Sequence, residues 1–444
     1  MQNSSNFFPI KERGSSVLTE VLAGFTTFAT MAYVLVVHTG MMIDAGMDGT
    51  GIMLSTALIS GLITIVMGLY SNLPFALAPG MGTNAILAYT LVAGGICSWQ
   101  VGIGLILISG SVFLVLSVFK VREKVVDWIP KILKIGVGAG VGIFLIRLSV
   151  VNAALVAPDF GGLGDFSNPS VMLAAIGLGI TLFLYFFRIE INGRTYVIRG
   201  SLLISIILTT IIGIFMGVVQ VPEHIFTANA ISALGKVAFK LDVKGALNPA
   251  YFSYILVFFM GDFFSTLGTA LGVAGKAGLL DEDGNLPVIG KVFLCDAVGT
   301  CVGALFGLTT VTTYVESASG AEAGGRTGLT SIVTGLLFIL SMFLAPLFLM
   351  IPTAATSPVL IVIGISMMQT LGNVDFADQE WYPVAIMVLV SLFCGLANAI
   401  ALGMVSYCLI HVVKYAFTSD RKKEDLPSVA TIIITLLSCI QFVL

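Results

Sequence analysis

Long apolar segments alternate with short polar connections along almost the whole chain. A membrane-spanning helix needs about 20 mainly apolar residues, and fourteen segments approach this length. They are residues 18–40, 51–70, 73–94, 100–118, 132–150, 171–187, 200–218, 251–272, 292–308, 309–324, 328–350, 354–371, 382–397 and 399–417. The pattern predicts an all-α polytopic membrane protein with about fourteen transmembrane helices. The apolar tail at 427–444 is either a fifteenth span or a helix that lies against the bundle.

Composition supports this class of protein. Of the 444 residues, 57% are hydrophobic and only 10% are charged, whereas soluble domains carry roughly 25% charged residues. The first residues are polar and basic without a small-residue cleavage site, so we expect no removable signal peptide. The six cysteines lack the spacing of metal ligands. We therefore expect no cofactor and no metal, and the lack of a concentrated basic patch argues against nucleic acid as a partner.

Basic residues indicate how the chain is oriented, because cytoplasmic loops carry an excess of lysine and arginine. With the N-terminus in the cytoplasm, most lysines and arginines near the ends of spans fall on the cytoplasmic side. The exceptions are Lys236, Lys240 and Lys244 in the 219–250 connection, and Arg147 near the outer end of its span. We expect a multi-pass protein of the plasma membrane, embedded in the lipid bilayer with both ends inside.

An internal repeat emerges when the chain is compared with itself at an offset of 239 residues. The matches place residues 26–30 over 265–269, Gly68 over Gly307, and Phe75 over Tyr314. Each copy contains seven spans, an odd number, so the second copy must enter the membrane inverted relative to the first. Inverted-topology repeats of this kind are characteristic of secondary transporters.

Polar and glycine-rich stretches interrupt the third and tenth spans. Residues 307–326 read GLTTVTTYVESASGAEAGGR, and the repeat pairs them with residues 72–84, NLPFALAPGMGTN. Irregular backbone at membrane depth is tolerated only where it is buried in protein or lines a cavity. Paired interruptions in the two halves therefore indicate a transporter binding site. Proline kinks that merely bend packed helices are the alternative.

Glu316 lies inside the second interrupted stretch. An ionisable residue at the centre of a span costs about 2.5–3.5 kcal/mol, so by default it indicates function. At the offset of 239 residues Glu316 lies over Leu77, so only the second copy supplies a carboxylate. A carboxylate that faces a cavity can accept hydrogen bonds from substrate N–H groups or hold a proton. The alternative is a structural acid bonded to neighbouring hydroxyls.

Asp262 shares one helical face of the eighth span with Ser265, Thr266 and Thr269. Ser and Thr alone commonly pack helices together, but an aspartate in the same stripe favours a face that looks into a cavity. We therefore expect Asp262 to be a second proton-coupling residue beside Glu316, or a residue that orients its neighbours.

Four stretches resemble one known family. They read TEVLAGFTTFATMAYVLVV, NLPFALAPGMGTNA, STLGTALGVAGKAG and TTYVESASGAEAGGRTGLT. From about Thr19 to Ala416 the chain is similar to the nucleobase–cation symporters of the second type, and among these to the AzgA-like branch of purine permeases.

The resemblance implies a fold in which each repeat contributes four spans to a core domain and three to a gate domain. The expected ranges are 1–17 for the cytoplasmic N-terminal tail, 18–118 and 251–350 for the core domain, 119–218 and 351–418 for the gate domain, 219–250 for the connecting segment, and 419–444 for a C-terminal tail or additional helix. Motion of the core against the gate would alternate access to the site. Relatives often dimerise through the gate domain, which implies a homodimer.

The resemblance also assigns residues to the site, where the third and tenth spans meet the eighth. Glu316 matches the tenth-span carboxylate, and Asn84 matches the asparagine of the third-span motif GMGLNA. Three departures are Ser265, where relatives usually hold an aspartate, Thr83, where they carry an apolar residue, and His38-Thr39, where they have Asn-Pro. The expected substrate-binding residues are Glu316, Ser265, Asn84, Thr83, Phe75, Tyr314 and Ser317, and the expected proton-coupling residues are Glu316 and Asp262.

The function implied by the resemblance is proton-coupled uptake of adenine, guanine or hypoxanthine. A planar base has an edge of donors and acceptors and an apolar face, which suit one carboxylate and nearby aromatic rings. The alternatives are another small solute, such as a pyrimidine base, xanthine, urate or a small anion, or a channel. Glu316 argues against an anion, with no basic residue placed opposite it in the sequence. No Ser/His/Asp or zinc constellation supports an enzyme.

Restoring the family carboxylate by Ser265→Asp should change substrate preference or the pH dependence of transport, because a second acid would be added to the stripe that contains Asp262. Initial uptake rates of adenine, guanine and hypoxanthine across a range of pH check this expectation. An unaltered profile would show that the departure at 265 is silent.

Overall fold

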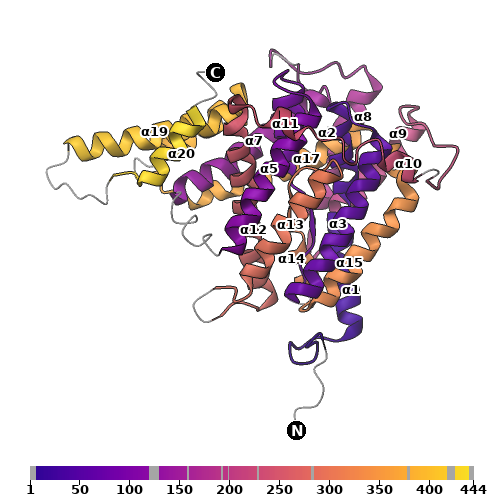
Figure 1. Cartoon of the computed structure of the whole chain (residues 1–444). Coiled ribbons are helices and arrows are strands. Elements are labelled where there is room, and N and C mark those ends of the chain that lie inside the picture. The colour runs from indigo at the N-terminus through magenta and orange to yellow at the C-terminus, as the bar shows by residue number, and fades with distance from the viewer. Residues whose placement is uncertain are drawn as a thin grey trace, which may run out of the picture.

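The computed structural model describes residues 7–119, 130–157, 160–191, 194–198, 200–227, 230–281, 285–377, 381–417 and 426–439. The described chain is predominantly helical (Figure 1). The longer helices are α1 (Val17–Met31), α2 (Tyr33–Asp44), α3 (Gly49–Ser71), α5 (Trp99–Val118), α7 (Lys131–Asn152), α8 (Pro169–Phe186), α9 (Ser201–Phe215), α12 (Phe252–Ala277), α13 (Ile289–Leu305), α15 (Gly328–Ser341), α17 (Thr353–Met368), α18 (Trp381–Cys394), α19 (Leu396–Phe417) and α20 (Val429–Cys439).

Shorter elements connect these helices. The short α-helices are α4 (Met81–Ala85), α10 (Ala230–Leu234), α11 (Val243–Ala246), α14 (Ser317–Glu322) and α16 (Ala345–Leu349). A π-helix, η1 (Ile86–Val92), continues α4, and single 3₁₀ turns are η2 (Pro249–Tyr251), η3 (Met342–Leu344) and η4 (Gln369–Asn373). The strands are β1 (Leu77–Pro79), β2 (Arg188–Ile191), β3 (Arg194–Val197) and β4 (Val311–Thr313).

Nine helical stretches within the described ranges are long and apolar enough to cross a membrane. They are Val17–Asp44, Gly49–Ser71, Trp99–Val118, Ile132–Asn152, Pro169–Phe186, Pro249–Ala277, Gly328–Leu349, Thr353–Gly372 and Asn398–Phe417. The remaining predicted spans fall on shorter helices or on the two interrupted stretches. Of the apolar tail, only 426–439 is described; its eleven-residue helix α20 packs on α19 and α12, and it is shorter than the length of about 20 residues that a span needs.

The two interrupted stretches meet as short antiparallel strands. β1 pairs with β4, and the ladder extends beyond the strands at both ends. The Gly80 N–H donates to the Thr310 carbonyl at 2.8 Å, and the Tyr314 N–H donates to the Ala76 carbonyl at 2.9 Å. Each interrupted span therefore supplies hydrogen-bond partners that the other needs at membrane depth.

Hydroxyl groups on neighbouring helices complete this hydrogen bonding. Thr64 of α3 accepts from the Leu77 N–H at 2.9 Å, and Thr300 of α13 accepts from the Val311 N–H at 3.0 Å. The first residue of each strand is thus held by a threonine of the helix that precedes it. The preceding helix α3 is capped at its C-terminus by Asn72, which adopts a left-handed φ of 54° that asparagine tolerates at a helix end.

Helix contacts recur between the two halves of the chain. α3 packs against α15 as α5 packs against α13, and α1 packs against α15 as α12 packs against α5. The offset of 239 residues expected from the sequence does not hold at the strands. Leu77 and Val311, the first residues of β1 and β4, are 234 positions apart. At this offset Glu316 corresponds to Gly82 rather than to Leu77, because fewer residues precede the strand in the second copy.

Reciprocal glycine pairs allow the closest helix crossings. A Cβ added to Gly61 of α3 would lie 2.6 Å from the Gly335 carbonyl oxygen, and one added to Gly335 of α15 would lie 2.5 Å from that of Gly61. Gly142 of α7 and Gly364 of α17 approach in the same reciprocal way, at 2.5 Å. Small residues of this kind let transmembrane helices pack backbone against backbone.

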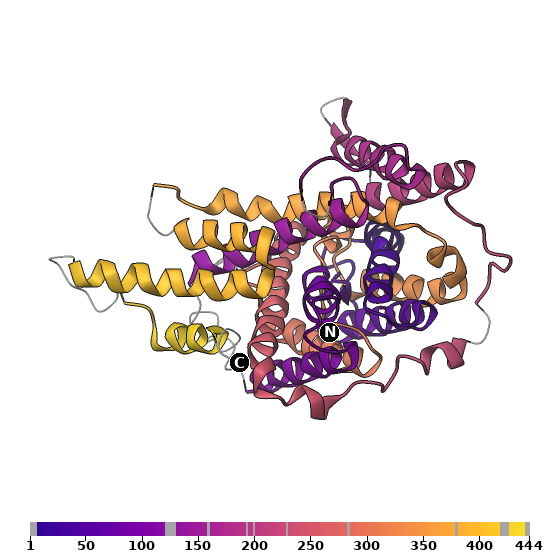
Figure 2. The ribbon, with the colours of Figure 1, turned by 90° about the horizontal axis from the view of Figure 1, so that it is seen from above.

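The helices form two packed groups. One contains α1, α3, α5, α13 and α15, and the other contains α7, α17, α18 and α19 with α8 and α9 against α17. Figures 1 and 2 show the yellow α19 and α20 on one side of the molecule, away from the indigo N-terminal helices. Assignment of these groups to a core and a gate domain remains a prediction.

Glu20 joins the first helix to the segment that follows the tenth span. Its buried carboxylate accepts from the Arg326 N–H at 3.0 Å, the Thr327 N–H at 3.2 Å and the Thr330 hydroxyl at 2.5 Å. Arg13 reinforces the same place, since its guanidinium donates to the Arg326 carbonyl at 2.8 Å. The turn between α14 and α15 is therefore fixed by the N-terminal region.

Replacing Glu20 by glutamine should destabilise the fold by about 1–3 kcal/mol. The amide keeps only one acceptor oxygen, so a buried donor loses its partner. Thermal unfolding of the purified protein in detergent should show a lower midpoint for Glu20→Gln and an unchanged one for Glu12→Gln, because Glu12 is exposed. Equal midpoints for the two variants would contradict this role.

Candidate functional site

A central cavity of about 540 Å³ lies against β4. Its wall is formed on one side by α2, α4, α12 and β4, and on the other by α7, α17 and α19 of the second packed group. Its hydroxyl-bearing and charged lining residues are Tyr33, Thr83, Lys134, Ser265, Thr269, Thr310, Thr312, Thr313, Tyr314, Glu316 and Thr370. The rest of the lining is mainly apolar, which is the usual composition of a small-molecule site.

Hydrogen bonds around the paired strands β1 and β4 hold several side chains of the cavity wall in place. The Thr83 hydroxyl donates to the Gly80 carbonyl at 2.8 Å and lies 2.8 Å from the Thr310 hydroxyl. Because Thr83 uses its hydrogen on Gly80, Thr310 is the donor of the hydroxyl pair. The Tyr314 hydroxyl donates to the Pro79 carbonyl, which holds the aromatic ring across the strands. The site is therefore preorganised by bonds between the two interrupted spans.

Glu316 is the one carboxylate among the residues that line the central cavity in the described structure. The Tyr33 hydroxyl donates to its Oε1 at 2.6 Å. No ion pair involving Glu316 is present among the residues that the structure describes. A carboxylate with one hydrogen bond to a tyrosine retains further lone pairs, so Glu316 can accept hydrogen bonds from a molecule in the cavity.

The family model described as the Permease family matches residues 18–441. This chain belongs to that family, the nucleobase–cation symporters of the second type. As a permease, it is a transporter rather than an enzyme.

Two curated relatives match almost the whole permease. The adenine permease AdeP of Escherichia coli strain K12 is 35% identical, over 91% of this chain and 89% of that protein. The guanine/hypoxanthine permease GhxP of Escherichia coli O157:H7 is 34% identical, over 92% of this chain and 91% of that protein.

A solved structure shows the same fold. The transmembrane domain of the cyanobacterial bicarbonate transporter BicA superimposes with a TM-score of 0.63, covering 86% of this chain and 97% of that chain at 17% identity. At this identity the likeness concerns the fold alone.

The structure brings four of the expected site residues of the permease together. Glu316, Ser265, Thr83 and Tyr314 all line the central cavity, and Ser265 is the most exposed of the four. Tyr314 and Glu316 lie in the segment between β4 and α14, Ser265 lies in α12, and Thr83 lies in α4. Residues far apart in the sequence thus face one space.

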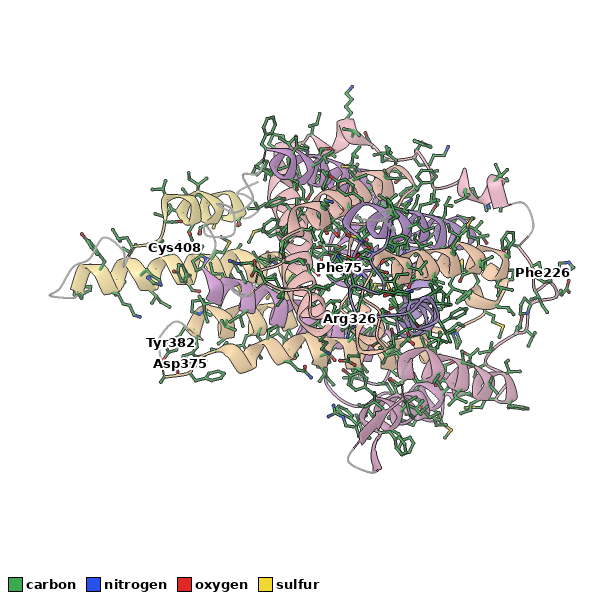
Figure 3. All side chains as sticks on the ribbon, turned by 90° about the horizontal axis from the view of Figure 1, so that it is seen from below. Phe75, Phe226, Arg326, Asp375, Tyr382 and Cys408 are labelled. Atoms are coloured by element: carbon green, nitrogen blue, oxygen red, sulfur yellow. The ribbon has the colours of Figure 1, made fainter. Side chains whose placement is uncertain are left out.

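The other expected residues lie behind the cavity wall. Asn84 is buried and accepts from the Thr309 hydroxyl, and the Ser317 hydroxyl accepts from the Ala76 N–H at 3.0 Å. Phe75, which precedes β1, is completely buried at the centre of the molecule (Figure 3). It is not part of the cavity lining. Asn84 and Ser317 therefore brace the interrupted spans, and Phe75 belongs to the core.

Two buried acids lie behind β4. Thr300 donates to Asp262 at 2.9 Å, and Thr266 donates to Asp296 at 2.5 Å. The other oxygen of each carboxylate has no hydrogen-bond partner in the described structure. Thr266 also lies 2.7 Å from the hydroxyl of the cavity-lining Thr312. Both acids are thus one hydroxyl away from β4, although neither lines the cavity.

Two cavity residues escaped the sequence interpretation. Tyr33 has no charge and lies in an apolar run, so it resembles an ordinary packing residue until its bond to Glu316 is known. Lys134 stands near the start of the predicted span 132–150, on the expected cytoplasmic side, which gives no sign of a cavity, yet it lines the central cavity. No basic residue was expected opposite Glu316, yet Lys134 shares the cavity lining with it, because the first turn of α7 lies along the cavity wall.

Removing the Tyr33 hydroxyl should weaken transport without unfolding the permease. Tyr33→Phe loses one hydrogen bond to a carboxylate, worth about 1.5–3 kcal/mol, so kcat/KM of uptake should fall by roughly ten- to a hundredfold. Uptake kinetics and the amount of folded protein in the membrane are measured together. Tyr382→Phe, at an exposed tyrosine, is the matched control, and equal kinetics for the two variants would exclude Tyr33 from the site.

Proposed function

We propose that this permease takes up a purine nucleobase, adenine, guanine or hypoxanthine, by proton symport across the plasma membrane. The proposal is supported by the names of relatives that match nearly the whole chain, an adenine permease and a guanine/hypoxanthine permease. The observation that carries it is the Glu316 carboxylate, which is oriented by Tyr33 at the wall of the central cavity.

Glu316 suits the hydrogen-bonding edge of a purine. An ionised carboxylate has only acceptors, and guanine offers it two adjacent N–H donors, at N1 and at the 2-amino group. A protonated carboxyl has one donor and one acceptor, and adenine offers the complementary pair, the acceptor N1 and the 6-amino donor. The protonation state of Glu316 thus affects which base edge it can bind, which links the substrate to a proton.

Neighbouring groups complete the proposed site. Ser265 and Thr83 supply hydroxyls at the cavity wall, and Tyr314 supplies an aromatic face. Asn84 and Ser317 contribute indirectly, by holding the interrupted spans. With Glu316, six residues from three separate segments would then bind or position one base.

The proposed second proton-coupling residue is Asp262. Its carboxylate is buried and bonded to Thr300, whose oxygen accepts from the first N–H of β4. A buried carboxylate without a cation is costly in its ionised form. A change in the position of β4 would therefore alter how Asp262 is satisfied, and with it the preference for a bound proton.

The proposed architecture is that of two inverted repeats of seven spans, fourteen in all, with the N-terminus in the cytoplasm. The recurring helix pairs support the repeat, and the central cavity lies between α12 and β4, from the expected core ranges, and α7, α17 and α19, from the expected gate ranges. Relative motion of these groups, as core and gate domains, would expose the cavity to each side in turn. A homodimer through the gate domain is part of the proposal.

A small anion is the second candidate substrate. Lys134 lines the central cavity, and a positive charge there favours anions. Glu316 in the same lining opposes this, because a carboxylate repels an anion. Other bases, such as a pyrimidine, xanthine or urate, would also find donors and acceptors in the cavity, whereas a channel has no need of paired interrupted spans.

Labelled-base uptake by a purine-auxotrophic host tests the proposal, with and without a protonophore. The wild-type permease should accumulate at least one purine base, and the protonophore should abolish accumulation. Accumulation that the protonophore does not reduce would exclude proton coupling. Uptake of bicarbonate without uptake of any purine would favour a small anion as the substrate.

Glu316→Gln should abolish accumulation while leaving folded permease in the membrane, because the amide cannot exchange a proton. A loss of at least a hundredfold in concentrating uptake is expected, corresponding to about 2.7 kcal/mol. Glu322→Gln, six residues along the chain at a half-exposed ion pair with Lys276, is the control. Near-normal accumulation by Glu316→Gln would remove Glu316 from the mechanism.

A further inference from the structure

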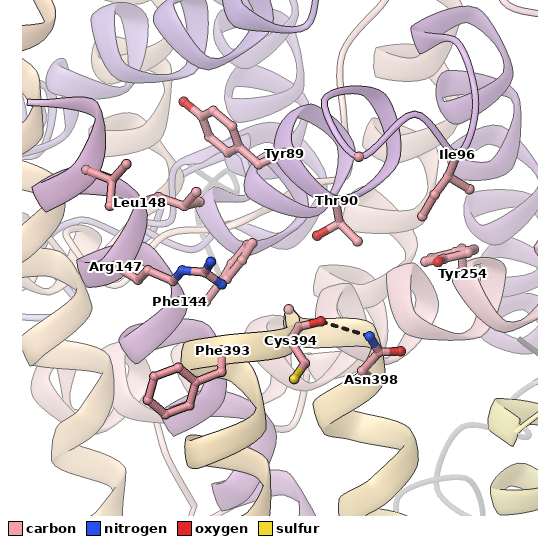
Figure 4. A pocket seen from close by; sticks show the side chains of 13 residues that line it. Tyr89, Thr90, Ile96, Phe144, Arg147, Leu148, Tyr254, Phe393, Cys394 and Asn398 are labelled. Atoms are coloured by element: carbon pink, nitrogen blue, oxygen red, sulfur yellow. Dashed lines mark hydrogen bonds between the residues drawn. The ribbon is translucent and has the colours of Figure 1, made fainter. Parts of the chain in front are cut away.

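A second cavity, of about 410 Å³, lies at the other end of α7 from Lys134. Its lining includes Tyr89, Thr90, Arg147, Tyr254 and Phe393 (Figure 4). With the N-terminus in the cytoplasm, this end of α7 faces outward, so we call this space the outer cavity. None of its lining residues belongs to the central cavity.

The two cavities follow one another along the same helices. On α7, Val137 and Val141 line the central cavity, and Phe144, Arg147 and Val151 line the outer one. These positions are spaced by three or four residues, so they share one helical face.

Two further elements line both spaces. η1 places Ile86 at the central cavity and Thr90 at the outer one, and α12 places Val257 and Tyr254 in the same way. Ile86, Val257 and Phe144 are buried at the junction. The outer cavity therefore lies in line with the substrate site, and its exposed lining residues Phe393 and Cys394 place its other side at the protein surface.

Arg147 is the one charged residue in the lining of the outer cavity within the described structure. Its guanidinium has no hydrogen bond or ion pair with any described residue, and its contact is with the Phe160 ring, 5.8 Å from the ring centroid. The buried Thr90 hydroxyl also has no hydrogen-bond partner within the described ranges. Figure 4 shows the Arg147 guanidinium directed into the cavity, so a donor fork without a hydrogen-bond partner among the described residues faces this space.

Aromatic rings enclose these polar groups. The aromatic residues in the lining of the outer cavity are Tyr89, Phe144, Tyr254 and Phe393. The Tyr89 hydroxyl donates to Asp44 at 2.7 Å and accepts from Asn152 at 3.0 Å, which fixes its ring. Flat apolar faces around a planar cation are suited to a planar ligand with hydrogen-bond acceptors on its edge.

We propose that the outer cavity is a second binding site, selective for 6-oxopurines such as guanine and hypoxanthine, which the base occupies before it reaches the central cavity. The proposal rests on the proposed function. A guanidinium offers two parallel N–H donors, which match the O6 and N7 acceptors on one edge of guanine. Adenine carries a 6-amino donor in place of O6, so one Arg147 donor would face another donor. Arg147 would thus distinguish oxopurines from adenine.

Equilibrium binding of labelled guanine and adenine to the purified full-length permease tests the proposal. The wild type should bind two guanines but one adenine per chain. Arg147→Gln should weaken the outer guanine site by about tenfold or more, the cost of a lost bidentate pair, and leave adenine binding unchanged. Arg147→Lys keeps the charge but not the fork, and it should lose the same site. Glu316→Gln should retain the outer guanine.

The outcomes separate the two proposals. If the wild type binds one guanine that Glu316→Gln removes and Arg147→Gln retains, the outer site is excluded and the central site stands. Equal losses of guanine and adenine in Arg147→Gln would also overturn selectivity, as would displacement of the outer guanine by bicarbonate. If the wild type binds neither base, the proposed function itself fails and the outer site fails with it.

Discussion

Backbone hydrogen bonding at membrane depth is the constraint on which this structure depends. Each unsatisfied N–H or C=O group in the hydrocarbon region costs several kcal/mol, so a span cannot be interrupted unless its free groups find partners. Here the two interrupted spans satisfy each other as β1 and β4, and Thr64 and Thr300 take the first N–H of each strand. The two halves of the chain are therefore joined where a site can form.

The paired strands β1 and β4 also position the polar side chains on both of their sides. On the cavity side they hold Tyr314 and Thr310, with Glu316 just beyond β4. Behind β4, Thr266 connects the lining Thr312 to the buried Asp296. Acidic side chains thus lie on both sides of β4. A shift of this strand would disturb the hydrogen bonds on the cavity side and those of the buried acids together, so substrate binding and proton binding would depend on the same strand. This is the physical basis of the coupling that we propose.

Sequence patterns predicted the parts of this arrangement that are local. Prolines, glycines and threonines in apolar runs indicated both interruptions, and a lone carboxylate in one of them indicated Glu316. Long-range relations were not predictable: Tyr33 bonds to Glu316 across 283 positions, and Leu77 and Val311, which begin the two strands, are 234 positions apart instead of the expected 239. Phe75 was expected at the substrate because aromatic rings suit bases. Its side chain is instead buried in the core, because the three-dimensional path of the chain before β1, which the sequence pattern does not show, determines where the ring lies.

Substrate protection of a single thiol in the central cavity tests the account most directly. Ser265→Cys, in a transport-competent permease whose six native cysteines are replaced by serine, places that thiol at an exposed position of the lining. Leu389→Cys, exposed on α18, is the reference. A transported purine should slow maleimide labelling at position 265 and leave labelling at 389 unchanged. If every purine that the variant transports leaves labelling at 265 unaltered, the central cavity is not the substrate site.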